Sequence, residues 1–247
     1  MSSELVCSAI IKFIREEVKK RNTRVVVIGI SGGIDSAVTV ALAVKALGPK
    51  KVFGLILPDS SVTPKSDTIH AIQLAEQQKI RYKLIELKTF KKSLLQKLPD
   101  DKLAGGNLLV RLRMSIIYYY AAILNGIVLG TGDKSEMSLG YFTKYGDGAA
   151  DLLPIADLYK TQVRTIAHYL SVPNEIINKK SSARLWKGHT AEGELGVAYE
   201  DIDLILDHFE RRITIPNRLR KKAIKIKGLI EKNRHKQQMP VVCKMSS

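Results

Sequence analysis

The sequence lacks several features that would place it in a narrower class. It holds two cysteines, Cys7 and Cys243, which are too few and too far apart for a disulfide framework or a zinc site. No apolar run reaches the roughly 18 residues that a membrane span needs. The amphipathic stretch 1–21 lacks the uninterrupted apolar core of a signal peptide. We therefore expect a cytoplasmic protein without a membrane segment.

Acidic residues are also scarce. The 24 Asp and Glu residues face 40 Lys and Arg residues, which gives a formal net charge of +16. Much of the excess lies between residues 211 and 236, where few acids accompany it. Such a segment is typical of a solvated basic helix and tail, or it attracts a small polyanion such as a dinucleotide. Nucleic-acid binding as the main task is not favoured, because no stacking aromatic residues are interleaved with these charges.

Short β-branched runs alternate with stretches of helical periodicity, which predicts an α/β fold. Repeated βα units imply an open parallel sheet with helices on both faces, in a single domain over 1–247. Segment 90–101 is expected to be a short helix or a lid, and 131–151 and 181–196 are expected to be loops. Strands are expected at 25–30, 52–57, 81–87 and 127–129, and helices at 3–20, 37–47, 65–79, 107–125, 159–170, 173–178, 199–209 and 216–231. The helix 107–125 is expected to open at Gly105-Gly106 and to lie in the core or at a subunit interface.

The chain is organised around residues 25–36, where a buried strand leads through Ser31-Gly32-Gly33-Ile34-Asp35-Ser36 into a helix. A strand, a glycine turn and a helix N-terminus direct backbone N–H groups and the helix dipole at a point that suits an anion. The two glycines lack Cβ, so the backbone can approach a phosphate closely and adopt a positive φ. Asp35 would repel a bare phosphate, which suggests an intervening Mg²⁺. The alternative is an ordinary tight turn with a capping serine.

A second polar cluster, residues 131–136, follows the strand expected at 127–129. Open parallel sheets bind ligands beyond the carboxyl ends of their strands, so this cluster and residues 31–36 can share one cleft. Glu136 could give the Mg²⁺ its second carboxylate, or it could be a cap or a surface ion pair. Lys160 stands near a helix start, which the dipole disfavours unless a phosphate lies there.

The stretch Ser31–Ser36 resembles the pyrophosphate loop Ser-Gly-Gly-x-Asp-Ser of the ATP pyrophosphatase superfamily. The common nucleotide-loop pattern with a lysine after the glycines is absent, and so is the dinucleotide fingerprint. The resemblance implies a Rossmann-like fold of the adenine nucleotide alpha hydrolase type. It also implies that ATP is cleaved between its α and β phosphates and that AMP is transferred to a substrate oxygen.

From about Gly29 to Pro240 the chain resembles the ammonia-dependent NAD synthetases, most specifically over 129–170 and also over 181–196. This resemblance implies a ligase that uses ATP and Mg²⁺ to adenylate the nicotinate carboxylate of deamido-NAD, releasing pyrophosphate. Ammonia then displaces AMP and gives NAD. It further implies a homodimer with deamido-NAD at the subunit interface. The alternatives are another adenylating member of the superfamily that acts on tRNA, and a nucleotide- or RNA-binding module without activity.

The resemblance also assigns site residues, but it implies no side-chain nucleophile. Asp151 is a candidate to contact the nicotinate end or the incoming ammonia. The chain departs from the family at His189, where glutamine is usual. No glutaminase domain precedes residue 24, so free ammonia or a separate chain is expected to supply the nitrogen. The implied residues are Gly29, Ile30, Ser31, Gly32, Gly33, Ile34, Asp35, Ser36, Thr131, Lys160 and Ser182 for ATP, Asp35 and Glu136 for Mg²⁺, and Arg111, Lys144, Asp151, His235 and Lys236 for deamido-NAD.

Overall fold

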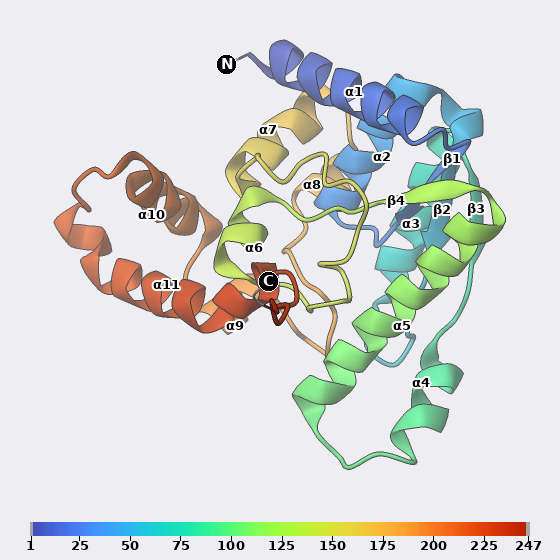
Figure 1. The fold of residues 1–247 in the computed structure, drawn as a ribbon. Helices are drawn as coiled ribbons and strands as arrows, with labels where there is room; N and C mark the ends of the chain where they lie inside the picture. Colours follow the sequence, from blue (N-terminus) through green and yellow to red (C-terminus); the bar gives the residue numbers. More distant parts are fainter. Residues whose placement is uncertain (1, 246–247) are drawn as a thin grey trace.

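The computed structural model describes residues 2–245 and contains an open sheet of four parallel strands in the order β3-β2-β1-β4 (Figure 1). The register places Val26 of the central strand beside Val52 on one side and Ile127 on the other. This sheet confirms the predicted fold class. The strands are β1 (Val25–Gly29), β2 (Val52–Ile56), β3 (Arg81–Leu84) and β4 (Gly126–Leu129).

The apolar side chains of β1 alternate between two separate cores. Val26 and Ile28 belong to one core, and Val25 and Val27 belong to the other. Because helices cover both faces, successive residues of the strand are all buried, as in other parallel sheets. The first core is covered by α1 (Ser3–Lys20), α2 (Ile34–Leu47), α3 (Lys65–Gln77), α7 (Lys160–Tyr169) and α8 (Asn174–Ile177), and the second by α5 (Lys102–Ile123).

A third apolar core lies under the C-terminal helices, away from the sheet. Helices α10 (Tyr199–Arg211) and α11 (Arg220–Asn233) pack against each other and against α6 (Lys134–Leu139). The short helix α9 (Ala191–Leu195) adds Ala191 and Leu195 to this core. Figure 1 shows the α10–α11 pair projecting from the sheet while the end of the chain returns toward α6 and α9. Helix α6 therefore connects the two parts of the molecule.

Helix α5 begins earlier than the sequence suggested, and Gly105 and Gly106 lie inside it. The side chain of Asp101 caps the helix by accepting a hydrogen bond from the N–H of Ala104 at 2.7 Å. A Cβ on Gly106 would lie 3.0 Å from the Cβ of Leu185, so the missing side chain lets the 181–190 segment pack closely against the helix. Packing thus outweighs the low helix propensity of glycine here. The expected short helix follows β3 as α4 (Lys88–Leu95).

The expectation of loops at 131–151 and 181–196 was wrong in part, since α6 lies in the first segment and α9 in the second. Residues Lys134–Leu139 form a helix rather than part of a loop, because Asp133 caps it by accepting the N–H of Glu136 at 2.8 Å. The basic end of the chain is bound to the rest of the molecule at Lys236, whose Nζ donates to the carbonyls of Gly140 at 2.8 Å and Phe142 at 2.9 Å. No helix among residues 2–245 is both long and apolar enough to cross a membrane.

Candidate active site

The turn between β1 and α2 is held by a network of serine hydroxyls. The Ser31 hydroxyl accepts the N–H of Gly33 at 3.2 Å, and the Ser36 hydroxyl donates to the Gly33 carbonyl at 2.9 Å. Gly32 has a φ of 74°, whereas Gly33 is extended with a φ of −98°, so only the first glycine needs the left-handed region. Helix α2 begins at Ile34, where Gly33 has no side chain to cap its first N–H groups. These amides therefore point into the turn and can bind an anion.

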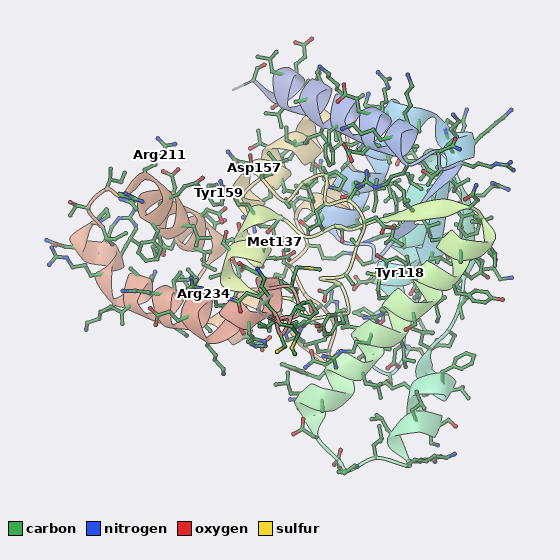
Figure 2. All side chains as sticks on the ribbon, in the orientation of Figure 1. Tyr118, Met137, Asp157, Tyr159, Arg211 and Arg234 are labelled. Atoms are coloured by element: carbon green, nitrogen blue, oxygen red, sulfur yellow. The ribbon has the colours of Figure 1, made fainter. Side chains whose placement is uncertain are left out.

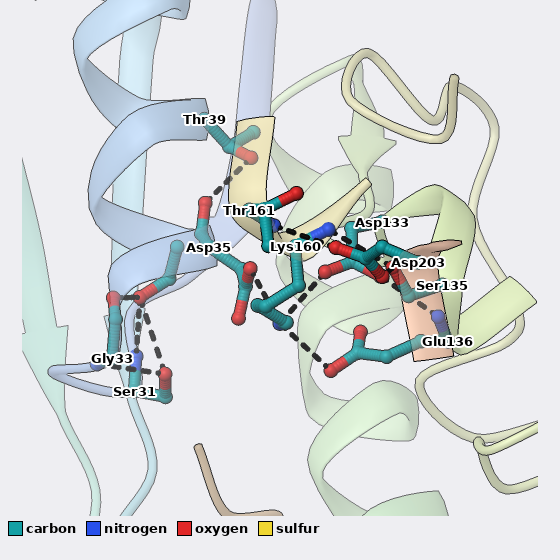
Figure 3. Close-up of polar contacts among 11 residues, drawn as sticks. Ser31, Gly33, Asp35, Thr39, Asp133, Ser135, Glu136, Lys160, Thr161 and Asp203 are labelled. Atoms are coloured by element: carbon teal, nitrogen blue, oxygen red, sulfur yellow. Dashed lines mark hydrogen bonds and ion pairs between the residues drawn. The ribbon is translucent and has the colours of Figure 1, made fainter. Parts of the chain in front are cut away.

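One buried ammonium group lies opposite this turn. The Nζ of Lys160, the first residue of α7, contacts Asp35 Oδ1 at 2.8 Å, Asp133 Oδ2 at 2.8 Å and Glu136 Oε1 at 3.1 Å (Figure 3). We call these four residues the lysine cluster. Lys160 and Asp133 are inaccessible to solvent, while Asp35 and Glu136 are partly exposed. The two carboxylates predicted to bind metal therefore do converge on one point.

The charges of the lysine cluster perturb one another strongly. Burial alone would lower the pKa of Lys160, but Asp35, Glu136 and Asp133 together raise it well above its ordinary value. Burial also raises the pKa of Asp133 to about 6, partly offset by Lys160. The pKa of Glu136 is raised well above its ordinary value, first by burial and then by the neighbouring carboxylates. The cluster thus holds more negative than positive charge in a poorly solvated place.

The cluster fits a magnesium ion shared with a substrate. Mg²⁺ in nucleotide sites is usually held by one or two carboxylates together with phosphate oxygens and water. Asp35 and Glu136 supply two carboxylates that both line a cleft. Residues 2–245 contain no group of three or more His, Cys, Asp or Glu side chains arranged to enclose a metal without help. The donor set therefore suits an ion that arrives with ATP.

A second layer of hydrogen bonds fixes the backbone that carries Lys160. The N–H of Lys160 donates to the Ser135 hydroxyl at 2.9 Å, and that hydroxyl donates to Asp203 of α10. The other oxygen of Asp203 accepts the N–H of Thr161 at 2.9 Å. Asp203 is 5% exposed. A carboxylate from the C-terminal helices thus caps α7 at the point where Lys160 enters the cluster (Figure 3).

A cleft of about 240 Å³ lies at the carboxyl ends of β1, β2 and β4. It is many times larger than the roughly 10–15 Å³ that one water needs. Nine of the residues implied for ATP or Mg²⁺ line it, while Gly32, Ser36 and Lys160 do not. The lining members are Gly29, Ile30, Ser31, Gly33, Ile34, Asp35, Thr131, Glu136 and Ser182, of which Glu136 was implied for Mg²⁺ alone.

Ser182 is held in the cleft by His189, the residue at which the chain departs from the family pattern. The Ser182 hydroxyl lies 3.2 Å from His189 Nδ1 and also donates to the His189 carbonyl. On its other side, His189 Nε2 lies 2.8 Å from Glu194 and 3.1 Å from the Tyr141 hydroxyl. His189 is 2% exposed. The buried imidazole therefore connects Ser182 with Glu194 and Tyr141 and holds the loop from its inner side.

Most of the residues implied for deamido-NAD gather around residues 140–144. Arg111 Nε donates to the Lys144 carbonyl at 3.2 Å, and Lys144 Nζ donates to the His235 carbonyl at 2.7 Å. Lys236 binds the carbonyls of Gly140 and Phe142, as described above. We call Arg111, Lys144 and Lys236 the carbonyl-bound group. Its members come from three distant parts of the chain and lie outside the lining of the cleft.

Comparison with known proteins decides the family. The NAD synthase family model matches residues 6–240. The NH(3)-dependent NAD(+) synthetase of Archaeoglobus fulgidus is 45% identical over 246 residues, which cover 99% of this chain and 98% of that protein. The chain belongs to the NAD synthase family.

Solved structures of this family have the same fold. The structure of NMN synthetase from Francisella tularensis superimposes with a TM-score of 0.90 at 34% identity and covers 99% of this chain and 100% of that one. The NH3-dependent NAD synthetase from Campylobacter jejuni gives a TM-score of 0.83 at 30% identity, with the same coverage. These matches confirm the predicted family and enzyme class, a ligase of NAD biosynthesis. They do not favour the alternative that acts on tRNA.

Asp151 makes its contacts with β4 and α5. Its Oδ2 accepts the N–H of Val128 in β4 at 2.7 Å, and its Oδ1 lies 3.5 Å from the Tyr118 hydroxyl. Tyr118 lies on α5, which stands on the opposite side of the view from Arg211 of α10 (Figure 2). Burial raises the pKa of Tyr118 to about 12, and Asp151 adds to the shift. The Asp151 carboxylate thus binds the backbone of the edge strand β4. Its suggested contact with the nicotinate end or with ammonia stays a prediction.

Sequence reasoning missed several charged residues of the site. Asp133 lies within the polar cluster 131–136, and its spacing to Glu136 is typical of a helix cap. Asp203 carried no signal, because it is one of several acids on an amphipathic helix, where acidic side chains are ordinarily solvated. Arg113 and Asp67 also line the cleft, and nothing near them in the sequence indicates it.

Proposed function

We propose that the chain amidates deamido-NAD with free ammonia at the expense of ATP, releasing AMP and pyrophosphate. A carboxylate is a poor electrophile, because oxide is a very poor leaving group. In the first step, a nicotinate oxygen bonds to the α phosphorus of ATP and the bond to the β-phosphate oxygen breaks. Ammonia then adds to the acyl carbon, AMP departs, and a proton is lost. The observation that carries this proposal is the convergence of the phosphate turn and the lysine cluster on one cleft.

The residues of the chain bind and orient the reactants in this proposal. The turn Ser31–Ser36 and the first amides of α2 bind the phosphates of ATP. Asp35 and Glu136 hold Mg²⁺, which neutralises phosphate charge when bound. Thr131 and Ser182 contact the nucleotide, and Lys160 sets the position of both metal-binding carboxylates. Orientation and charge stabilisation supply the rate, with no nucleophilic side chain.

The carbonyl-bound group and His235 bind the anionic dinucleotide. Arg111, Lys144 and Lys236 make no ion pair with a carboxylate among residues 2–245, so their positive charge is available to phosphates. Asp151 contacts the nicotinate end or the ammonia. The enzyme works in the cytoplasm as a homodimer. In support of the dimer, α5 presents Tyr119 and Ile123 at 64% and 60% exposure, which is apolar surface that a second copy of the chain can cover.

Turnover of the purified chain tests the proposal directly. Deamido-NAD, ATP, Mg²⁺ and ammonium should give NAD, AMP and pyrophosphate in equal amounts. Glutamine should not replace ammonium. ADP among the products, or efficient use of glutamine by the chain without a partner, would contradict it. Sedimentation velocity with and without deamido-NAD tests the dimer.

A second candidate acceptor is nicotinate mononucleotide. The structure that superimposes at a TM-score of 0.90 is named an NMN synthetase. Amidation of nicotinate mononucleotide, which is smaller than deamido-NAD, would give NMN. Comparison of kcat/KM for the two acceptors under saturating ATP and ammonium separates the candidates. If deamido-NAD is the acceptor, its kcat/KM exceeds that of the mononucleotide.

A further inference from the structure

A second group of charges, which makes no contact with the lysine cluster among the described residues, lines the same cleft. Asp67 of α3 accepts a 2.7 Å hydrogen bond from Arg184 Nε through Oδ2, and its Oδ1 lies 2.9 Å from Lys179 Nζ. All three residues line the cleft. The Asp67 side chain is 5% exposed, while those of Lys179 and Arg184 are 16% and 21% exposed. A buried carboxylate thus holds two cations at the edge of the cleft.

This group is built onto the phosphate turn itself. Lys179 Nζ donates to the Gly32 carbonyl at 2.7 Å. A Cβ on Gly32 would lie 2.1 Å from the carbonyl oxygen of Asp67, so the backbone of α3 packs directly against the turn. Gly32 is therefore needed for two reasons, its positive φ of 74° and this close approach. Any ligand in the turn lies beside Lys179 and close to Arg184.

Arg184 has an unfavourable backbone conformation, with a φ of 51°. A left-handed residue other than glycine is strained and persists only where its surroundings fix it. Here the Arg184 N–H donates to the Ser182 hydroxyl at 3.1 Å, while the side chain binds Asp67. Neither terminal nitrogen of the guanidinium donates to any residue among 2–245. The strained backbone thus places a planar pair of N–H donors in the cleft.

The lysine predicted to meet a phosphate is already fully occupied. An ammonium group has three donors, and Lys160 faces three carboxylates. Around Asp67, by contrast, the two cations Lys179 and Arg184 share one carboxylate, so positive charge is in excess. An anion in the turn is therefore attracted toward Lys179 and Arg184 rather than toward Lys160.

We propose that Arg184, together with Lys179, binds the polyphosphate of ATP and the pyrophosphate formed from it, with Asp67 as the positioning residue. The inference rests on the proposed function for the identity of the anion. A guanidinium offers two parallel N–H donors, which match two phosphate oxygens. Because the contact continues in the product, Arg184 also governs how tightly pyrophosphate is retained.

Arg184→Gly is the informative variant, since glycine relieves the strained φ while removing the charge. We expect KM for ATP and the inhibition constant of added pyrophosphate to rise about tenfold, the effect of losing one charge-assisted hydrogen bond. KM for deamido-NAD should stay the same, and the melting temperature should not fall. Arg184→Lys should recover part of the loss. Lys187→Gly is the matched control, because it removes an exposed positive charge from the same loop outside the cleft and should change neither constant.

The positioning role is tested in the Asp67→Asn background. There, Arg184→Gly should raise KM for ATP by less than it does in the wild type, because the guanidinium is no longer held. Unchanged KM for ATP and unchanged pyrophosphate inhibition in Arg184→Gly would overturn the inference, as would a lower melting temperature without a kinetic effect. If the wild type fails to form AMP, the proposed function fails instead. Calorimetric titration of pyrophosphate into wild type and Arg184→Gly then still decides whether Arg184 binds this anion.

Discussion

The lysine cluster and the carbonyl-bound group carry opposite charge, although residues 131–144 contribute to both. In the cluster, one ammonium group faces three carboxylates, so negative charge is in excess. In the carbonyl-bound group, each cation donates to a backbone carbonyl, which satisfies hydrogen bonds without neutralising charge. The first region suits a cation and the second suits an anion. A short stretch of chain thus prepares two neighbouring sites for ligands of opposite sign.

The largest effect should come from removing the positive charge of the lysine cluster. Lys160→Met leaves three carboxylates together, and losing one member of a buried ion pair costs about 3–5 kcal/mol of stability. We expect kcat/KM for ATP to fall about 10³-fold, with a smaller change in deamido-NAD binding. Added Mg²⁺ should raise the melting temperature of this variant more than that of the wild type. Equal responses of the two proteins to Mg²⁺ would contradict the assigned charge balance.

Asp35→Asn removes one of the excess negative charges instead. Pyrophosphate release should fall about 10²–10³-fold, because a charged ligand of the metal is lost. The melting temperature without Mg²⁺ should stay the same or rise, since the remaining carboxylates repel one another less. Asp157→Asn, at a side chain that is 97% exposed, is the control for charge alone. Normal turnover by Asp35→Asn would remove Asp35 from the metal site.

Removing a positive charge from the carbonyl-bound group should have a moderate effect, which falls on deamido-NAD rather than on ATP. Lys144→Gln keeps a donor for the His235 carbonyl but loses the charge, so KM for deamido-NAD should rise about tenfold while KM for ATP is unchanged. The difference from wild type should shrink at high salt, because screening weakens the wild-type attraction. Lys12→Gln, at a side chain that is 76% exposed on α1, is the matched control. A change confined to KM for ATP would reassign Lys144.

The smallest effect should be a pH dependence of stability. Burial raises the pKa of Asp133 from 3.8 to about 6, so the folded state binds this proton more tightly than the unfolded state. The associated stability is present below about pH 4 and is lost as the pH rises through about 6. The Asp133→Asn variant has no carboxyl group at this position, so it does not lose this stability as the pH rises. In Mg²⁺-free buffer, the melting temperature of the variant relative to wild type should therefore increase between pH 5 and pH 8, and the opposite trend would contradict the shift.

The sequence predicted the sheet well because parallel strands buried on both faces are continuous apolar runs. The turn Ser31–Ser36 was recognisable for a similar reason, since its glycines, serines and carboxylate are adjacent in the chain. Lys160 was expected to face a phosphate of ATP, and that contact stays a prediction. In the structure its ammonium group faces three carboxylates.

The remaining site could not be predicted, because its contacts join residues that are far apart in the chain. Asp67 and Arg184 are separated by 117 positions, and Lys236 and Gly140 by 96. Local rules failed where tertiary packing opposed them, as at Gly106, which lies inside a helix because Leu185 packs on it. The missed helix α6 is different. Its cap, Asp133, and Glu136 have the spacing of a capping box, so this error was avoidable.

The two hydrogen bonds that Lys236 donates to the carbonyls of Gly140 and Phe142 affect the order in which the protein can fold during its synthesis. A ribosome releases the phosphate turn and the whole sheet long before it reaches residue 236. During translation the strands and the phosphate turn can therefore fold first, whereas the contacts of Lys236 form only after residue 236 has been made. A chain that stops before residue 236 would keep every strand of the sheet but would lack these contacts with Gly140 and Phe142.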